Sequence, residues 1–288
     1  MHPSAHRTTN NTHPLRQASC WLSLAALLSV PLIVNASPDH HGASDSNLQQ
    51  VINDDHRSAK NKARDEFRKP LETLSWLGIK DNMTVIEVTP GGGWYTEILA
   101  PYLKDNGTYY AAGFDGQDGA NWAKRAAKRF NDKLTADPAS YGKVNVTVLA
   151  PPSKTEIAPA GSADMVLTFR NVHNWMKAGT SDAVFAAMHN ALKSGGTLGV
   201  VEHRGNPDVK QDPKAKSGYV NQSDTIAMAE KAGFKLVGKS ELLANPKDSK
   251  DHKKGVWTLL PSLRLGKEDQ DKYLAIGESD RMLLKFVK

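Results

Sequence analysis

The chain has 288 residues, of which 39% are hydrophobic and 24% are charged. This length is sufficient for a full hydrophobic core, and the composition is that of a soluble globular protein. The formal net charge of +6 is spread along the chain rather than concentrated in one block, so the sequence predicts no nucleic-acid partner.

The first 36 residues have the pattern of a secretory signal peptide. Arg7 and Arg16 precede an apolar run from Cys20 to Val34, and Ala36 ends the segment with a small residue. The run has 15 residues and is interrupted by a proline, whereas a membrane span needs about 20 residues, so a signal is favoured over an anchor. We therefore expect cleavage after Ala36, a periplasmic or secreted location, and no stable membrane insertion of the mature chain.

Cys20 is the single cysteine, and it lies in the segment that we expect to be removed. A mature chain without a thiol has no disulfide, no thiolate metal site and no cysteine nucleophile. This composition suits an oxidising compartment.

Residues 37–55 are polar with little periodicity, and we expect a flexible leader there. A helical pattern begins at His56 and is divided by Pro70, because proline is tolerated in the first turn of a helix but not in its interior. This pattern predicts two helices, one on each side of Arg68, at the start of a domain that spans residues 56–288.

After Gly78, short β-rich runs alternate with helical patterns, which indicates a parallel sheet with helices on both faces. Five such runs lie at residues 84–88, 108–114, 144–149, 164–169 and 197–203. Two more, at 234–243 and 281–287, are separated by a Pro- and Lys-rich loop without a clear helix, which predicts an antiparallel closing pair. The expected fold is α/β, with one seven-stranded, mostly parallel sheet whose last strand is antiparallel.

Gly91, Gly92 and Gly93 follow the first of these runs, TVIEV. Glycines at the end of a strand imply positive φ angles or a close approach of a ligand to the backbone. Glu87 is the only charge in the run, and a buried carboxylate needs a partner. The dinucleotide fingerprint GxGxxG fails because Thr96 occupies its third glycine position. The first strand-to-helix turn of an open α/β sheet is nevertheless a common site for nucleotide-like ligands.

The acid, the short spacer and the glycine turn resemble the first motif of class I S-adenosylmethionine-dependent methyltransferases. The resemblance covers nearly all of residues 56–288, and it is greatest to a group of secreted bacterial methyltransferase-like proteins. The shared stretches are PGGGWYTEILAPYL, LTFRNVHNWM, GVWTLLPS and GESDRM. The resemblance implies a Rossmann-like class I methyltransferase fold with S-adenosylmethionine as cofactor.

The resemblance also implies a cofactor site. Residues 91–93 would pass beneath the methionine end of the cofactor, and Glu87 would anchor its amino group. Asp115 resembles the acid that binds the ribose hydroxyls; Asp118 is the alternate, and turn formation in FDGQDG explains Asp115 equally well. Two positions depart from the family pattern: Thr89 replaces a common glycine, and the segment 150–152 lacks the acid that usually contacts adenine.

The predicted catalytic residues, Arg170, Asn171 and His173, follow the fourth strand, from which many methyltransferases address the acceptor. If the extended conformation continues, Asn171 and His173 face the same side. Asn171 would then orient the acceptor while His173 takes its proton. A structural role for His173 is the alternative.

For each of several other polar and aromatic residues, the sequence allows two alternative roles. Glu202 and His203 end the fifth strand and form either an ion-pair network or a metal site, but no metal-binding motif spacing is present and we predict no metal. Arg281 makes a structural salt bridge or contacts a ligand. Trp94 and Tyr95 either flank the ligand or pack the first helix on the sheet.

The sequence supports two functions. The first is S-adenosylmethionine-dependent methyl transfer to an unidentified small acceptor, in which the pocket aligns the reacting groups. The alternative is a non-catalytic ligand-binding protein of the cell envelope on a methyltransferase scaffold. Export away from the cytosolic source of the cofactor favours the alternative, whereas the buried acid and the polar groups after the fourth strand favour the enzyme. The sequence does not indicate an oligomeric state.

Overall fold

The structure is a computed structural model that describes residues 40–288, with side chains from residue 46 onward. The predicted signal peptide, residues 1–36, lies outside the described residues. The described residues, 40–288, belong to one compact unit. Within the described part of the chain, no helix combines the length and apolar character needed to span a bilayer.

Helix α1 (His40–Asn53) occupies most of the segment for which the sequence predicted a flexible leader. Leu48 and Ile52 are 0% and 5% exposed, and they belong to the same core cluster as Leu99. The prediction of a flexible leader is therefore wrong for this helix. Leu48 lies three residues before Val51 and four before Ile52, so these apolar side chains form a one-sided face that can be buried although the segment as a whole is polar.

Three short helices follow before the first strand: α2 (Ala59–Lys62), α3 (Asp65–Arg68) and α4 (Pro70–Leu77). The chain breaks at Lys69, where φ is 41°, and Pro70 occupies the first position of α4. The predicted helix boundary after Arg68 is confirmed. The segment before it forms two separate turns of helix rather than one continuous helix.

Seven strands form a single sheet in the order β3-β2-β1-β4-β5-β7-β6. The strands are β1 (Thr84–Val88), β2 (Thr108–Gly113), β3 (Asn145–Val148), β4 (Ala163–Phe169), β5 (Leu192–His203), β6 (Lys235–Ser240) and β7 (Arg281–Val287). Strand β7 lies between β5 and β6 and is antiparallel to both. The predicted fold, seven strands with an antiparallel last strand, is confirmed.

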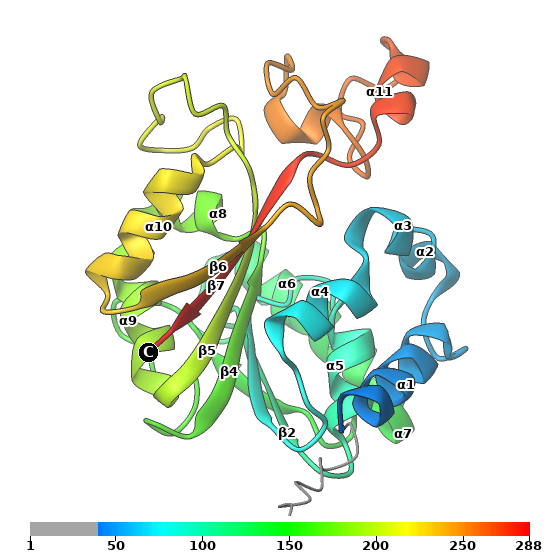
Figure 1. Cartoon of the computed structure of the whole chain (residues 1–288), viewed down its shortest axis with the longest axis vertical. Coiled ribbons are helices and arrows are strands. Elements are labelled where there is room, and N and C mark those ends of the chain that lie inside the picture. Colours follow the sequence, from blue (N-terminus) through cyan, green and yellow to red (C-terminus); the bar gives the residue numbers. More distant parts are fainter. Residues whose placement is uncertain (1–39) are drawn as a thin grey trace, which may run out of the picture. The chain divides into compact units, whose positions relative to one another are not determined.

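Helices cover both faces of this sheet (Figure 1). After β1 the remaining helices are α5 (Thr96–Leu103), α6 (Asn121–Ala136), α7 (Pro138–Tyr141), α8 (Val172–Ala178), α9 (Ser181–Ala191), α10 (Gln222–Lys231), a 3-10 turn (Gly255–Thr258) and α11 (Gln270–Ile276). Alternate residues of β1 enter different cores: Ile86 and Val88 pack with Phe185 of α9, and Val85 packs with Leu74 of α4. This alternation follows from the two-residue period of a strand buried on both faces.

The parallel pairing brings the carboxyl ends of β1, β2, β3, β4 and β5 to one edge of the sheet. In the register, Glu87 of β1 lies opposite Ala111 of β2 and Leu167 of β4. The first residue of β7, Arg281, pairs with His203, so β7 begins at the same edge. This edge carries all the residues that the sequence singled out for function.

Candidate functional site

The turn after β1 uses left-handed backbone at Thr89, Gly91 and Gly93, whose φ angles are 56°, 61° and 75°. The chain must reverse quickly here, because β1 ends at Val88 and α5 begins at Thr96. Thr89 has the positive φ that a glycine would adopt freely, although threonine replaces the common glycine. The left-handed turn is therefore retained, with a β-branched residue in a sparsely populated conformation.

The three glycines face different surroundings. A Cβ atom added at Gly91 or Gly92 would have no other atom within 4 Å. A Cβ atom added at Gly93 would lie 3.1 Å from the side chain of Lys133. Gly93 thus permits close packing of the turn on α6. The structure assigns open space to Gly91 and Gly92, and it corrects the expectation that Gly93 faces a ligand.

Glu87 is 3% exposed, and its Oε2 atom accepts hydrogen bonds from the hydroxyl groups of Thr96 and Tyr109. Burial raises the pKa of Glu87 to about 7 even though both hydrogen bonds favour the ionised form. The partner that the sequence required is therefore supplied by the protein. The second carboxylate oxygen, Oε1, accepts no hydrogen bond from a described residue.

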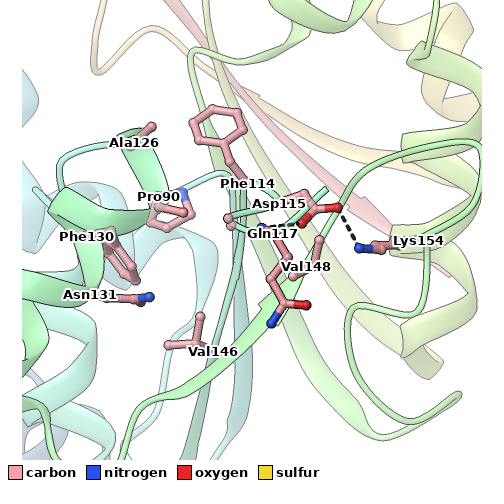
Figure 2. A pocket seen from close by; sticks show the side chains of 14 residues that line it. Pro90, Phe114, Asp115, Gln117, Ala126, Phe130, Asn131, Val146, Val148 and Lys154 are labelled. Atoms are coloured by element: carbon pink, nitrogen blue, oxygen red, sulfur yellow. Dashed lines mark hydrogen bonds and ion pairs between the residues drawn. The ribbon is translucent and has the colours of Figure 1, made fainter. Parts of the chain in front are cut away.

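Asp115 follows β2 and is held by three donors. Its Oδ1 atom accepts hydrogen bonds from the backbone N–H groups of Gln117 and Asp118, and Lys154 approaches Oδ2 at 2.6 Å (Figure 2). The hydrogen bond from Lys154, followed by those from the backbone, lowers the pKa of Asp115 to about 2. The turn-forming interpretation of Asp115 is therefore confirmed. Asp115 also lines a cavity, and its contact with ribose hydroxyls stays a prediction.

Lys154 was not singled out in the sequence. It also contacts Asp118 at 2.8 Å, so one amine joins both candidate acids of the FDGQDG stretch. It reaches them because the chain folds back after β3, where Ala150 and Lys154 form an isolated bridge. The position of this lysine depends on that turn, and its distance in sequence from Asp115 gives no signal of the contact.

Two cavities adjoin Asp115. One of about 260 Å³ lies between the glycine turn, the ends of β2 and β3, and the apolar face of α6, with Phe130 and Val146 in its wall (Figure 2). The other, of about 700 Å³, is lined by residues that follow each of four strands: Thr89, Asp115, Ala150 and Trp175 among them. Ligands of open α/β sheets bind at such a crevice outside the carboxyl ends of the strands. The larger cavity is therefore the candidate cofactor site.

The predicted catalytic residues are not arranged as an extended strand. Strand β4 ends at Phe169, Arg170 has a φ of 63°, and Asn171 is the N-terminal cap residue of α8, so Asn171 and His173 do not share a strand face. The Asn171 amide donates to the carbonyl groups of Val88 and Thr89. It thereby ties the turn after β1 to the end of β4, which gives Asn171 a structural role.

His173 is 6% exposed and pairs with Glu202 of β5. Its Nδ1 atom lies 3.0 Å from Oε1 of Glu202, and its backbone N–H donates to Oε2. The carboxylate also accepts the backbone N–H of His203. His173, Glu202 and His203 therefore lie together at the carboxyl ends of β4 and β5, and the Glu202 carboxylate holds the His173 ring in place.

His173, Glu202 and His203 offer ligand atoms that all lie within 4.8 Å of one another, so they form the group of described residues that could hold a metal ion. The Nδ1 atoms of the two histidines have different partners. Nδ1 of His203 shares a hydrogen bond with Ser279, while Nδ1 of His173 is engaged by the carboxylate. Burial, the nearby His173 ring and then surrounding arginines lower the pKa of His203 well below its usual range.

Four arginines surround Glu278 in the GESDRM stretch. Arg64 donates from Nε to Glu278 at 2.6 Å, and Nη1 of Arg281 lies 3.0 Å from the same carboxylate. Burial alone would raise the pKa of Glu278, but Arg281, with Arg68, Arg170 and Arg64, lowers it to about 2. The structural salt bridge expected for Arg281 is confirmed. The contribution of α3 to this cluster was not foreseen, because it depends on how the N-terminal helices pack.

Trp94 and Tyr95 pack inside the protein at 6% and 4% exposure. Tyr95 stacks on Phe169 with ring centroids 3.4 Å apart, and the guanidinium group of Arg68 lies 4.4 Å from the ring centre of Trp94. The packing role that was one of the two alternatives is therefore the one observed. Both rings also form part of the wall around the arginines.

No family model and no curated protein matches this chain. Solved methyltransferase structures do match it. A putative sarcosine dimethylglycine methyltransferase from Galdieria sulphuraria is 13% identical, with a TM-score of 0.50 over 83% of this chain and 89% of that chain. Phosphoethanolamine N-methyltransferase 2 from Haemonchus contortus, in complex with S-adenosyl-L-methionine, is 12% identical, with a TM-score of 0.50 over 84% of this chain and 60% of that chain.

A SAM-dependent methyltransferase from Aquifex aeolicus is 19% identical, with a TM-score of 0.48 over 68% of this chain and 92% of that chain. At these identities the likeness concerns the fold alone, and the two structures with a TM-score of 0.50 carry it. The chain has the Rossmann-like fold of class I methyltransferases.

Proposed function

We propose that this protein is an S-adenosylmethionine-dependent methyltransferase that acts on a small acceptor. The observation that carries the proposal is the cavity of about 700 Å³ at the ends of β1, β2, β3 and β4. Its size lies within the usual range for small-molecule and cofactor sites. The buried acid and the glycine turn, to which the family resemblance assigns the cofactor, lie in β1 and in the turn that follows it.

The residues around the cavity fit the cofactor by their chemistry. Asp115, in the cavity wall, offers carboxylate oxygens to ribose hydroxyls. Glu87 lies in β1 outside the lining of this cavity, and its free Oε1 atom is an acceptor for an amino group. Gly91 and Gly92, in the turn after β1, do not line this cavity; Gly91 lines the neighbouring cavity of about 260 Å³, and open space beside both glycines lets a ligand approach their backbone. The end of β3 presents Leu149, Ala150 and Pro151, so adenine would be held there by apolar contact rather than by an acid.

His173 is the proposed base. When bound, S-adenosylmethionine would supply an electrophilic methyl group for the acceptor, and S-adenosylhomocysteine would be the leaving group. Nδ1 of His173 donates to Glu202, which leaves Nε2 as the atom that takes the acceptor proton. The carboxylate positions the ring and stabilises the imidazolium that forms, as carboxylates do in other histidine bases. The net change is the acceptor's proton exchanged for a methyl group.

Thermal unfolding of residues 37–288 with and without S-adenosylmethionine tests the proposal. At about 100 times the dissociation constant, the cofactor should stabilise the folded state by roughly 2.7 kcal/mol. S-adenosylhomocysteine should act in the same way, and ATP serves as the control for non-specific nucleotide binding. An unchanged melting temperature with both sulfur compounds would contradict the proposal.

The proposal includes export of the protein to the periplasm or the medium after cleavage of a signal peptide. The N-terminal pattern that predicts a signal peptide supports it, and N-terminal sequencing of the protein from the envelope fraction tests it. A chain that begins at Ser37 is the expected product, whereas an intact Met1 would exclude cleavage.

A further inference from the structure

We propose that the acceptor carries an anionic group, a carboxylate or a phosphate, and that this group binds to the arginine cluster formed by Arg64, Arg68, Arg170 and Arg281. The inference rests on the proposed methyl transfer and adds the chemical class of the acceptor to it. The cluster gathers at the edge of the sheet where β4 ends and β7 begins, with two members contributed by the segment of α3.

The cluster contains more positive than negative charge. Glu278 is the carboxylate that its members share: it pairs with Arg64 and Arg281, and Nε of Arg68 lies 3.7 Å away, beyond hydrogen-bond range. Buried charges are stable only when they are paired and hydrogen-bonded. One carboxylate cannot meet this requirement for four guanidinium groups.

The shortage of hydrogen-bond acceptors for the guanidinium groups is clearest at Arg68. It is 1% exposed, and none of its three guanidinium nitrogens has a hydrogen-bond partner among the described residues. Nη2 of Arg64 and Nε of Arg281 are also buried without a partner. Burial lowers the pKa of Arg68 to about 8, with the charge of Arg170 as the next contribution. Buried polar groups without partners are rare in native proteins, so a ligand that supplies acceptors explains them.

Arg170 and Arg64 are the partly exposed members of the cluster. Arg64 pairs with Glu278, whereas the side chain of Arg170 makes no hydrogen bond or salt bridge to a described residue. Its backbone lies in the left-handed region, a conformation that is retained at functional sites more often than elsewhere. The planar fork of a guanidinium group matches the two oxygens of a carboxylate or phosphate, so this geometry favours an anion.

A metal ion at the neighbouring histidines is the competing occupant, and the charges argue against it. The Glu202 carboxylate already accepts three hydrogen bonds, from the ring and backbone of His173 and the backbone of His203. Arg170, Arg281 and Arg68 lie close enough to His203 to lower its pKa further. The same field that repels a proton there repels a divalent cation, whereas it attracts an anion.

The cluster also lies beside the proposed cofactor site. The charges of Arg68 and Arg170 act on the carboxyl group of Glu87, which we assign to the cofactor amino group. His173 follows Arg170 by three residues, and its ring centre lies 5.5 Å from that of His203. His203 in turn lies close enough to the arginines for their charges to lower its pKa. An acceptor anchored at the arginines would therefore lie in the same region as Glu87 and the proposed base.

Anion titrations test the inference. The mature chain is saturated with S-adenosylhomocysteine and titrated with inorganic phosphate or acetate at constant ionic strength, and binding is followed by calorimetry. We expect Arg170→Gln to weaken binding of the favoured anion by about 10- to 100-fold, the usual effect of losing a charged hydrogen bond. Arg170→Lys should recover part of this loss. Lys239→Gln, which removes one exposed positive charge on β6, should bind like the wild type.

The outcomes separate the two proposals. If neither anion binds to the wild type, or if Arg170→Gln leaves anion binding unchanged, the inference is wrong. If Arg170→Gln weakens S-adenosylhomocysteine and leaves the anions unaffected, the cluster binds the carboxylate of the cofactor, and the inference is again wrong. If the wild type binds an anion but not S-adenosylhomocysteine, the anion site is supported and the proposed methyl transfer is contradicted.

Discussion

Single residues at the sheet edge are held in states that folding alone does not favour. Glu87 is buried with a raised pKa, Thr89 has a positive φ, and Arg68 is buried with unpartnered nitrogens. Each of these states lowers the free energy of unfolding. Proteins retain such destabilising features mainly where binding of a ligand or a reaction offsets them. The three residues belong to the same edge, which supports one continuous site for cofactor and acceptor.

The role of His173 can be separated from its packing. Replacing it by alanine should leave the melting shift with S-adenosylmethionine intact but reduce turnover about 10²- to 10⁴-fold, the usual contribution of a general base. Glu202→Gln keeps an acceptor for Nδ1 but removes the negative charge, so it should give a smaller loss. The measurement is the rate of S-adenosylhomocysteine formation with an anionic acceptor. Full turnover would remove His173 from the mechanism, and a collapsed melting temperature would show a structural role.

Gly91 offers a steric test of the cofactor site with a matched control. Gly91 and Gly161 both have a positive φ, 61° and 64°, and neither has an atom within 4 Å of an added first side-chain carbon. Leucine at either position should therefore cost a similar backbone strain of about 1–2 kcal/mol. Gly91→Leu should also lose the melting shift with S-adenosylmethionine, whereas Gly161→Leu should keep it. Equal shifts in both variants would show that the cofactor does not pass Gly91.

At the scale of elements, the strands were easier to predict than the short helices. Alternating runs with β-branched residues identified all seven strands, and Pro70 marked a real helix boundary. Helix α1 was missed because its composition is polar and only a narrow apolar stripe is buried. The helical conformation of residues 172–178 was missed because a strand pattern was extended beyond Phe169 into a segment where α8 begins.

Helix α1 should contribute measurably to stability. Leu48 is fully buried against the core that contains α4 and α5, so Leu48→Ala should lower the free energy of unfolding by about 2–5 kcal/mol. Gln50→Ala changes an exposed residue of the same helix and should have little effect. Urea unfolding of both variants gives the comparison. If Leu48→Ala is as stable as Gln50→Ala, the segment does not pack as α1 and the leader is flexible after all.

At the scale of the whole molecule, sequence patterns predict the sheet because hydrophobic periodicity is local. The site could be predicted only where it follows directly from strand order: Glu87, the glycine turn and Asp115 all lie at the ends of consecutive strands. The pairing of Asp115 with Lys154, and of Glu278 with Arg64, joins segments far apart in the chain. Such contacts depend on loop paths and helix packing, which carry no short-range signal.

Glu87 links the site to the stability of the whole molecule. The pKa of Glu87 is about 7 in the folded chain, against an ordinary value of 4.5 that applies to the unfolded chain. Between these two pH values the folded chain therefore binds more protons than the unfolded chain. The free energy of unfolding should therefore fall as pH rises from 4.5 to 7, and the full penalty, about 3 kcal/mol, should persist above pH 7. Because the carboxylate is 3% exposed, solvent screens this penalty little.

Glu87→Gln isolates this effect. The amide stays neutral and still offers an oxygen to Thr96 and Tyr109, so the variant should match the wild type near pH 4 and exceed its stability by up to about 3 kcal/mol at pH 8. Urea unfolding at a series of pH values measures the difference, and Glu72→Gln, at an exposed position of α4, is the control. Binding of S-adenosylmethionine should weaken in the same variant, because Oε1 no longer carries negative charge. Parallel stability curves for Glu87→Gln and the wild type would show that the buried acid is already neutral or fully compensated, and its assignment to the cofactor amino group would lose its electrostatic basis.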